Sequence, residues 1–433
     1  LEILARGPHR RVIMVGGTAQ NRAVTRYLRE DVADLHIPEE APYFEALGAA
    51  IAAFDRGRAV GDVLFSEGSS AFSFLPPLQD AEELVRWERI EREAPEVGDS
   101  CIVGLDVGST TTKAVLIRQD DDAVLGSVYL RTSGNPVAAS RACFEGLLDQ
   151  IKRNGINESD IRIVGIATTG SGRQISGLYA LTDTIVNEII AHAAAAVHFD
   201  PEVDTIFEIG GQDAKYTHLT GGVASDYAMN EACSAGTGSF LEEAAHESFG
   251  VATEDIAELA LLGSRPPNFN DQCAAFISSD IKNAVHEGIT REDILAGLVY
   301  SICFNYSNRV KGNRPVGRKI FLQGGVCYNR AVPLAMAGIL GKEIVVPPEP
   351  GLMGAYGAAL ELKQRLALGV TTQRDFVLSE IIERAVEHEE PFVCAGGADH
   401  CDLKCDVARI RIEGKVYPFG GACNRYYNIV HKT

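Results

Sequence analysis

Two cysteines stand just before helical patterns, where a thiolate is favoured. Cys233 precedes the helical run 240–245, and Cys273 precedes the run 276–281. A helix N-terminus offers free N–H groups and partial positive charge, which lowers the pKa of a nearby thiol. A 4Fe-4S cluster takes four thiolates, so a two-fold dimer would complete one from two such pairs. The alternative is a pair of buried core cysteines, because no short CxxC spacing is present.

Further cysteines gather near the C-terminus, within 30 residues of one another: Cys394, Cys401, Cys405 and Cys423. Thiols at this density are typical of a second Fe–S cluster or a Zn²⁺ site. The spacing matches no standard motif, so plain thiols remain the alternative. The other four cysteines are expected in the core: Cys101, Cys143, Cys303 and Cys327.

Three glycine-containing turns have the residues that a phosphate group needs. The run 102–117 is typical of a strand, a polar turn with Gly108, and a second strand. Glycine permits close backbone approach, hydroxyl and N–H groups hold phosphate oxygens, and Asp106 can hold Mg²⁺ through water. The run 204–216 repeats this pattern, and a third turn at Gly324 leads into a helix. Alone, the first turn could be an ordinary Gly-Ser hairpin.

In this order and spacing, the three turns resemble those of the actin, sugar-kinase and heat-shock chaperone ATPase superfamily. The resemblance implies an α/β fold in which two ribonuclease-H-like halves clamp ATP in a cleft. It implies a catalytic set of Asp106, Gln212 and Asp213, in which the two aspartates arrange Mg²⁺ and the attacking water. The superfamily more often has Asp where this chain has Glu208. The implied nucleotide-binding residues are Gly108, Ser109, Thr110, Thr111, Thr112, Lys113, Gly210, Gly211, Gly324 and Gly325.

The segments around Cys233 and Cys273 narrow the resemblance from the superfamily to one family within it. Residues 106–113, 209–213, 233–238 and 270–273 together look like the activator ATPases of 2-hydroxyacyl-CoA dehydratases and the ATPase subunits of benzoyl-CoA reductase, the BadF/BadG/BcrA/BcrD type. The resemblance covers roughly residues 100 to 365. It adds four residues to the nucleotide-binding set: Ala235, Gly236, Thr237 and Gly238.

This family resemblance implies a function and a set of partners. Cys233 and Cys273 of each protomer would hold one 4Fe-4S cluster across a homodimer. ATP binding or hydrolysis would drive a low-potential electron from a ferredoxin or flavodoxin to a dehydratase or reductase that acts on a CoA ester. Two alternatives stay open. One is a small-molecule kinase of the same superfamily, and the other is an ATP-sensing binding module without redox chemistry.

An internal repeat indicates how the chain is divided. The pattern of residues 11–24 returns at 319–332, a shift of 308 positions from Gly16 to Gly324. We expect a partial first ATPase repeat over residues 1–60, a linker over 61–99, a complete ATPase domain over 100–370, and a cysteine-rich segment over 371–433. This arrangement resembles the long activases that carry two such domains in tandem.

Composition limits the class of protein further. With 433 residues, 46% hydrophobic and 23% charged, the chain can bury sizeable cores. A net charge of −19 argues against a nucleic-acid surface. The sequence has no apolar run of membrane-spanning length and no signal peptide at Leu1, so we expect a cytoplasmic protein.

Overall fold

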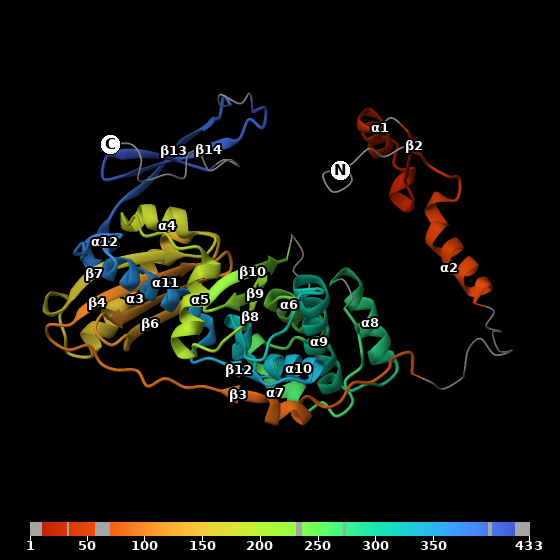
Figure 1. Ribbon diagram of the computed structural model, residues 1–433, viewed down its shortest axis with the longest axis horizontal. Helices are drawn as coiled ribbons and strands as arrows, with labels where there is room; N and C mark the ends of the chain where they lie inside the picture. The colour runs from red at the N-terminus through yellow and green to blue at the C-terminus, as the bar shows by residue number, and fades with distance from the viewer. Residues whose placement is uncertain are drawn as a thin grey trace. The chain divides into compact units, whose positions relative to one another are not determined.

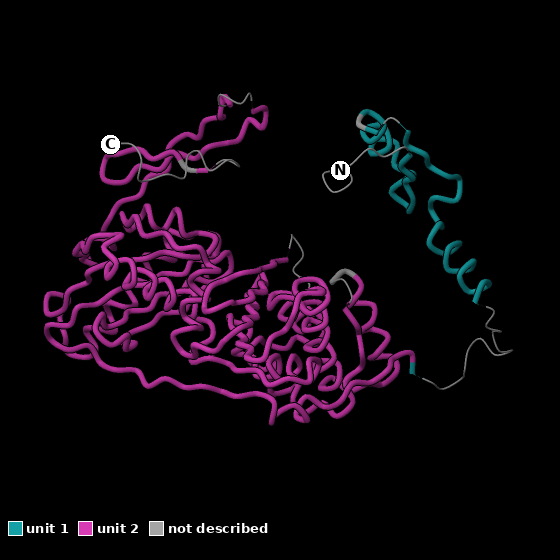
Figure 2. The backbone as a smooth tube through the Cα atoms, viewed as in Figure 1, with its two compact units in different colours: residues 1–70 teal, residues 71–433 magenta. Residues whose placement is uncertain are grey.

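The protein forms two compact units, Leu1–Ser70 and Ala71–Thr433 (Figure 2). The computed structural model describes residues 11–32, 34–56, 70–230, 236–271, 274–396 and 401–420. Of the predicted site residues, Cys233, Ala235, Cys273 and Cys423 lie outside these ranges.

Unit 1 contains two short parallel strands and the helices that connect and follow them. Its elements are β1 (Val12–Ile13), η1 (Gly17–Gln20), α1 (Arg22–Asp31), β2 (Leu35–His36), η2 (Ala41–Tyr43) and α2 (Phe44–Asp55). None of the residues of α2 is buried, although most of them are apolar.

The local structure of unit 1 matches that of the later copy of the repeat. Gly16 has φ 89° and Gly324 has φ 98°, values that favour glycine. The Gly16 N–H donates to Ala41 O at 2.6 Å, and the Gly324 N–H donates to Pro350 O at 2.9 Å. The two glycine turns of the repeat therefore share one backbone conformation.

In unit 2, the first half is built on a four-stranded sheet of order β6-β5-β4-β7. Its strands are β4 (Ser100–Val107), β5 (Thr111–Arg118), β6 (Val124–Arg131) and β7 (Arg162–Thr169). Apolar residues alternate between two faces, so Leu105 packs with Phe144 on one side and Ile102 packs with Met353 on the other. The helices and turns are α3 (Pro136–Arg153), η4 (Glu158–Asp160), α4 (Arg173–Ala180), α5 (Glu188–Phe199), α11 (Met353–Ala367) and α12 (Leu378–Glu383).

The second half is built on a six-stranded sheet of order β10-β9-β8-β11-β12-β3 (Figure 1). Its strands are β3 (Val85–Trp87), β8 (Thr205–Ile209), β9 (Ala214–Thr220), β10 (Val223–Met229), β11 (Ile320–Gln323) and β12 (Ile344–Val346). The helices and turns are η3 (Leu78–Leu84), α6 (Gly238–Phe249), η5 (Thr253–Asp255), α7 (Ile256–Leu261), α8 (Ala274–His286), α9 (Arg291–Asn305), the π-helix η6 (Tyr306–Lys311), η7 (Gly325–Tyr328), α10 (Ala331–Leu340) and η8 (Pro350–Leu352).

Part of the stretch predicted as a linker belongs to this second sheet. Val85 of β3 pairs in parallel with Ile344 of β12, and Leu78 of η3 is fully buried. The apolar side chains of this stretch join the core beside α10. Residues 78–87 are therefore part of the second half.

Beyond α12, three antiparallel strands form a separate sheet: β13 (Val386–Val393), β14 (Asp406–Ile412) and β15 (Lys415–Phe419). Ile410 and Ile412 of β14 pack against Leu178 of α4. One end of this sheet is therefore attached to the first half through apolar contacts.

Helix α11 is held between β4 and α5 by two glycines. A Cβ atom at Gly104 would lie 1.8 Å from Ala355 O, and one at Gly357 would lie 1.7 Å from Ala191 O. Both neighbours are backbone atoms, which cannot turn aside as a side chain can. The packing of α11 against the sheet and against α5 therefore depends on these glycines.

We predict that Gly357→Ala lowers the free energy of unfolding by about 3 kcal/mol or more, because the methyl group would overlap the α5 backbone. Gly338→Ala is the matched control, since its new methyl group would find ordinary contacts at 3.6 Å. There, better helix propensity should leave stability unchanged or raise it by up to about 1 kcal/mol. Urea unfolding of both variants measures the difference, and equal stability would contradict the packing argument.

Candidate functional site

Two β-hairpins of the same design form the floor of a polar cleft. In the first, Asp106 of β4 lies opposite Lys113 of β5. In the second, Glu208 of β8 lies opposite Lys215 of β9. Each acid comes two residues before a glycine turn, and each lysine comes seven residues after the acid. The two halves therefore present equivalent acid–lysine pairs to the space between them.

The first pair is partly shielded from water. Lys113 Nζ lies 3.0 Å from Asp106 Oδ2, and their side chains are 13% and 10% exposed. Burial would lower the pKa of Lys113, but the Asp106 carboxylate outweighs burial and the pKa is raised. Behind the turn, the Thr132 hydroxyl donates to Gly108 O at 2.8 Å. This bond ties the turn to the residue that directly follows β6.

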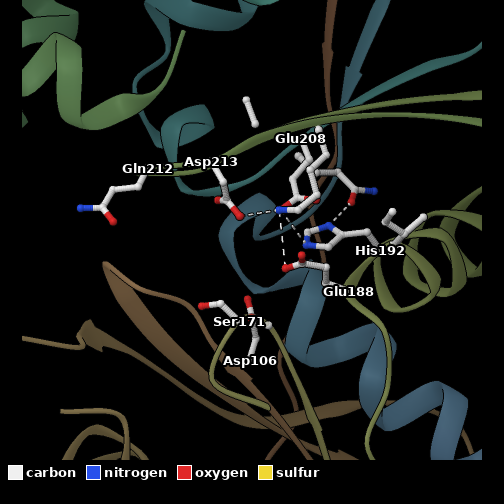
Figure 3. Close-up of polar contacts among 12 residues, drawn as sticks. Asp106, Ser171, Glu188, His192, Glu208, Gln212 and Asp213 are labelled. Atoms are coloured by element: carbon white, nitrogen blue, oxygen red, sulfur yellow. Dashed lines mark hydrogen bonds and ion pairs between the residues drawn. The ribbon is translucent and has the colours of Figure 1, made fainter. Parts of the chain in front are cut away.

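The second pair is part of a larger charge cluster around Lys215, whose side chain is 1% exposed. Its Nζ atom lies 2.7 Å from Asp213 Oδ2, 3.1 Å from Glu208 Oε1 and 3.5 Å from Glu188 Oε2. In Figure 3 the side chains of Glu188, Glu208 and Asp213 point toward one another. One buried cation therefore holds three acids that come from β8, the turn after it, and α5.

The carboxylates of this cluster differ in pKa. Burial raises the pKa of Glu188 above its ordinary value, and the neighbouring acids add to the rise while Lys215 opposes it. Burial also acts to raise the pKa of Asp213, but Lys215 reverses the effect and the pKa is lowered. Asp213 is thus the more firmly ionised of the two acids.

His192 connects α5 to both neighbouring strands of the second half. Its Nδ1 atom lies 2.7 Å from Gln323 Oε1, and its Nε2 atom lies 3.4 Å from Glu208 Oε1. The residue is 6% exposed and has partners at both nitrogens. This is the environment of a structural core histidine that helps to place Glu208.

The two glycine turns approach each other closely. A Cβ atom at Gly211 would lie 3.0 Å from the Thr110 side chain, so the turns of the two halves nearly touch. On the other wall, a Cβ atom at Gly325 would lie 2.2 Å from the Tyr129 hydroxyl. Glycine at these positions keeps the facing surfaces close without collision.

The described residues that line this cleft include most of the predicted set. They are Asp106, Gly108, Ser109, Thr110, Thr111, Lys113, Tyr129, Ser171, Glu188, His192, Glu208, Gly210, Gly211, Gln212, Asp213, Lys215, Gly324, Gly325 and Gly351. Gln212 points away from the carboxylate cluster, as Figure 3 shows. Thr112 is fully buried behind the hairpin, where its hydroxyl lies 2.9 Å from that of Thr132.

Sequence reasoning missed three contributions to the cleft. Tyr129 lies near the end of β6, and no local sequence pattern predicts that its side chain faces Gly325. Gly170 has φ 87°, and a Cβ atom there would lie 2.5 Å from Asp106 Oδ1. Lys215 gathers Glu188, Glu208 and Asp213, and Glu188 comes from a helix distant in the sequence. The equal spacing of Asp106 to Lys113 and of Glu208 to Lys215 was the available signal.

The donor set of the cleft fits Mg²⁺. Four carboxylates, those of Asp106, Glu188, Glu208 and Asp213, face two lysines, which leaves an excess of negative charge. The described residues hold no group of three or more such side chains already arranged around one ion. Mg²⁺ in nucleotide sites needs only one or two carboxylates besides phosphates and waters, so this arrangement suffices.

The segment that contains Cys233 is anchored on the second glycine turn from both sides. Before it, the Ala214 N–H donates to Asn230 Oδ1 at 2.8 Å, and the Asn230 N–H donates to Ala214 O at 3.1 Å. After it, the Gly238 N–H donates to Gly210 O at 3.0 Å. Gly236, Thr237 and Gly238 thus lead from this segment to the back of the turn.

Helices α6 and α8 follow the two predicted cluster cysteines and lie close together. Phe240 and Leu241 of α6 share one apolar core with Ile277 and Ile281 of α8. Cys273 immediately precedes α8 in the sequence. The cysteines predicted for the core, Cys101, Cys143, Cys303 and Cys327, are indeed buried. Burial raises the pKa of both Cys101 and Cys143 to about 12, so these thiols stay protonated.

Comparison with known sequences identifies the family. The sequence profile of the BadF/BadG/BcrA/BcrD ATPase family matches residues 103–361. The chain belongs to this family. It is therefore an ATPase, as the three turns predicted.

Two relatives of this chain are named as activating proteins. A 2-hydroxyisocaproyl-CoA dehydratase activator from Clostridioides difficile is 34% identical over 60% of this chain and 93% of its own length. The (R)-2-hydroxyglutaryl-CoA dehydratase activating ATPase of Acidaminococcus fermentans is 29% identical over 61% of this chain and 98% of its own.

Solved structures confirm the predicted fold. The C. difficile activator with bound ADPNP matches with a TM-score of 0.55 and 30% identity, over 63% of this chain and 98% of that one. The A. fermentans dehydratase component A matches with a TM-score of 0.56 and 27% identity, over 62% and 99%. The ATPase has the fold of actin, sugar kinases and heat-shock chaperones. Among its described helices, none is long and apolar enough to cross a membrane.

We predict that Lys215→Met lowers the free energy of unfolding by about 3–5 kcal/mol at pH 7, because three acids lose their buried partner. The loss should shrink as the pH falls towards 4, where the carboxylates take up protons in both folded and unfolded chains. Lys363→Met is the control, since the pair of Lys363 with Asp122 is 28% and 18% exposed and should contribute about 1 kcal/mol at most. Urea unfolding at pH 7 and pH 5 measures both variants, and a pH-independent loss would contradict the charge argument.

Proposed function

We propose that this ATPase uses nucleotide binding and hydrolysis to transfer a low-potential electron to an enzyme that acts on a CoA ester. The partner would be a 2-hydroxyacyl-CoA dehydratase or a benzoyl-CoA-reductase-like protein, and the donor a ferredoxin or flavodoxin. The named functions of the C. difficile and A. fermentans relatives support a dehydratase as partner.

The observation that carries the proposal is the direct hydrogen bonding between the second glycine turn and the two residues on either side of the Cys233 segment. Asn230 and Gly238 flank this segment, and both bond to residues 210–214 of the turn. A shift of the turn towards or away from a γ-phosphate must therefore move both ends of the segment. No linker or intermediate domain is needed for this coupling.

In the cleft, we assign separate roles to the side chains. Lys113 neutralises phosphate charge, the turn N–H groups hold phosphate oxygens, and Lys215 keeps the three acids around it in place. Asp106 and Asp213 would hold Mg²⁺, which would supply positive charge to the phosphates when bound. Gln212 stands at the turn and would position the attacking water once its side chain rotates inward. Gly324 and Gly325 would admit the adenosine side of the nucleotide.

We assign Cys233 and Cys273 as the ligands of a 4Fe-4S cluster shared by two protomers. The cluster would supply the electron of low potential. The assignment is supported by the helices that follow the two cysteines, because α6 and α8 pack in one apolar core. The partial positive charge of the α8 N-terminus favours the thiolate of Cys273.

We also propose that residues 1–60 are the carboxyl-terminal part of a second ATPase domain. The shared conformation of the turns at Gly16 and Gly324 supports this assignment. The described residues of unit 1 include no counterpart of either phosphate hairpin, so unit 1 should not bind ATP by itself.

Iron content tests the electron-transfer role. After anaerobic purification and reconstitution, we predict about two cluster irons per chain, which is one four-iron cluster per dimer. Cys233→Ser should lose this iron, while Cys101→Ala, which removes a buried thiol outside the site, should keep it. Iron and sulfide assays with analytical ultracentrifugation measure both quantities. An iron-free protein that still hydrolyses ATP would contradict the proposal and favour an ATP-sensing module, and hydrolysis that requires a hydroxyl acceptor would favour a kinase.

Coupling between the nucleotide and the cluster segment has a separate test. We predict that Asn230→Ala removes most of the difference in iron-chelation rate between the ATP and ADP states, because one anchor on the glycine turn is lost. The rate of ATP turnover should fall by a smaller factor than the difference in chelation rate. Ser225→Ala, at the far end of the same β9–β10 hairpin, should retain both. Stopped-flow chelation measures the rates, and an unchanged difference in Asn230→Ala would contradict this coupling route.

A further inference from the structure

The side chain of Tyr129 reaches across the cleft from the first half to the second. Tyr129 belongs to β6, but its ring meets Gly325 and Tyr328 of η7 and Gly351 of η8. The ring centroids of Tyr129 and Tyr328 lie 5.8 Å apart with planes at 85°, the edge-to-face arrangement that aromatic pairs favour. A Cβ atom at Gly351 would lie 2.8 Å from Tyr129 Cε2, and one at Gly325 would overlap the Tyr129 hydroxyl. Gly325, Gly351 and Tyr328 thus form a seat for the Tyr129 ring.

The two glycines of the seat are explained by the tyrosine rings and not by the backbone. Both lie in 3₁₀ helices, and neither has the positive φ that Gly324 has. Other residues could therefore adopt their backbone conformation. The atoms nearest to a Cβ atom at either position all belong to Tyr129 or Tyr328. Glycine at these two positions therefore makes room for the aromatic pair.

The earlier copy of the repeat has the glycine turn without the seat. Gln20 ends η1 at the position where Tyr328 ends η7. Pro42 holds the place of Gly351, directly after the residue that accepts the hydrogen bond of the glycine turn. The described residues of unit 1 also include no counterpart of β6. The seat therefore accompanies the strand whose tyrosine fills it, whereas the turn conformation does not require it.

The aromatic pair lies at the mouth of the cleft, where it opposes opening. Tyr129 is 41% exposed and Tyr328 is 48% exposed, whereas Asp106 inside the cleft is 7% exposed. The cavity that the cleft residues enclose measures about 40 Å³. Sites for ligands of nucleotide size measure about 300–1,000 Å³. The two halves must therefore separate before a nucleotide enters, and the contact of Tyr129 with its seat must break.

Further contacts connect the pair to its surroundings on both sides of the cleft. In the second half, the Tyr328 hydroxyl donates to Glu349 Oε2 at 3.1 Å, and Arg92 Nη2 lies 2.6 Å from Glu349 Oε1. In the first half, Lys113 Nζ lies 5.7 Å from the centroid of the Tyr129 ring, within the range of a cation–π contact. We assign Lys113 to the phosphate groups, so an arriving phosphate competes with the ring for this lysine. Phosphate binding would thus help to release Tyr129.

We propose that Tyr129 gates the nucleotide cleft: its ring holds the two halves together at the mouth and must leave the seat before ATP or ADP can enter. The proposal rests on the assignment of this cleft to the nucleotide, and it is independent of the proposed electron transfer. The seated ring lowers the fraction of the protein that can bind, so it weakens the apparent affinity by the same factor. The strength of aromatic pairs makes this factor about two- to tenfold.

Nucleotide binding by the full chain tests the gate, with ATP that carries a fluorescent label on its ribose as the probe. We predict that Tyr129→Ala binds this probe faster and more tightly, each by the factor given above. Tyr328→Ala should have the same effect, and the double variant should gain no more than Tyr129→Ala alone, because both changes remove one contact. Tyr27→Ala, which alters an exposed tyrosine of unit 1, is the control and should keep the wild-type rate.

Stopped-flow fluorescence measures the association rate, and titration measures the affinity. An unchanged or slower association in Tyr129→Ala would overturn the gate. Weaker binding would do so too, because it would make Tyr129 a direct contact of the nucleotide. Iron content does not enter these measurements, so their outcome is separate from that of the cluster assays.

Gly351→Ala tests the seat by adding an atom instead of removing one. Its methyl group would overlap both rings, so Tyr129 should leave the seat and the probe should bind faster, as in Tyr129→Ala. Combined with Tyr129→Ala, the change should bring no further gain. A folding defect would lower binding, whereas the gate requires faster association. A wild-type or slower association rate in Gly351→Ala would overturn the assignment of the seat.

Discussion

Balanced burial of charge in the cleft is the constraint on which the rest of the structure depends. Four acids and two lysines lie between the halves, and Lys215 alone contacts three of the acids. The strand register that places each acid opposite its lysine also fixes the length of each glycine turn. Charge pairing and phosphate-turn geometry are therefore set together. The remaining excess of negative charge suits a divalent cation that arrives with an anionic nucleotide.

Much of this site could be predicted from the sequence because the chemistry is local. Glycine turns between apolar strands identify the hairpins at Gly108 and Gly210, and the repeat of Gly16 at Gly324 is visible without a structure. What the sequence could not provide is contact between distant segments. Tyr129 reaches Gly325 only because the two halves meet, and the inward or outward direction of Gln212 depends on a rotamer.

Short elements were the other limit of sequence reasoning. β3 has three residues, too few to show the alternation that marks a strand, and it lies between prolines at positions 77 and 95. The stretch therefore resembled a linker, although its burial beside α10 makes it part of the sheet. Likewise, the cysteine spacing of the tail matches no known motif, and the antiparallel pairing of β13 with β14 is what shows that Cys394 and Cys405 are neighbours.

Each half of unit 2 is completed by a segment from far along the chain. The second sheet takes its edge strand β3 from before the first half, and α11, which packs against β4 and α5, comes after the second. A ribosome must therefore synthesise almost the whole ATPase domain before either half can close its core. Neither half therefore has a complete core early in synthesis. The apolar face of the first sheet therefore stays exposed on the nascent chain until α11, which ends at residue 367, has been synthesised.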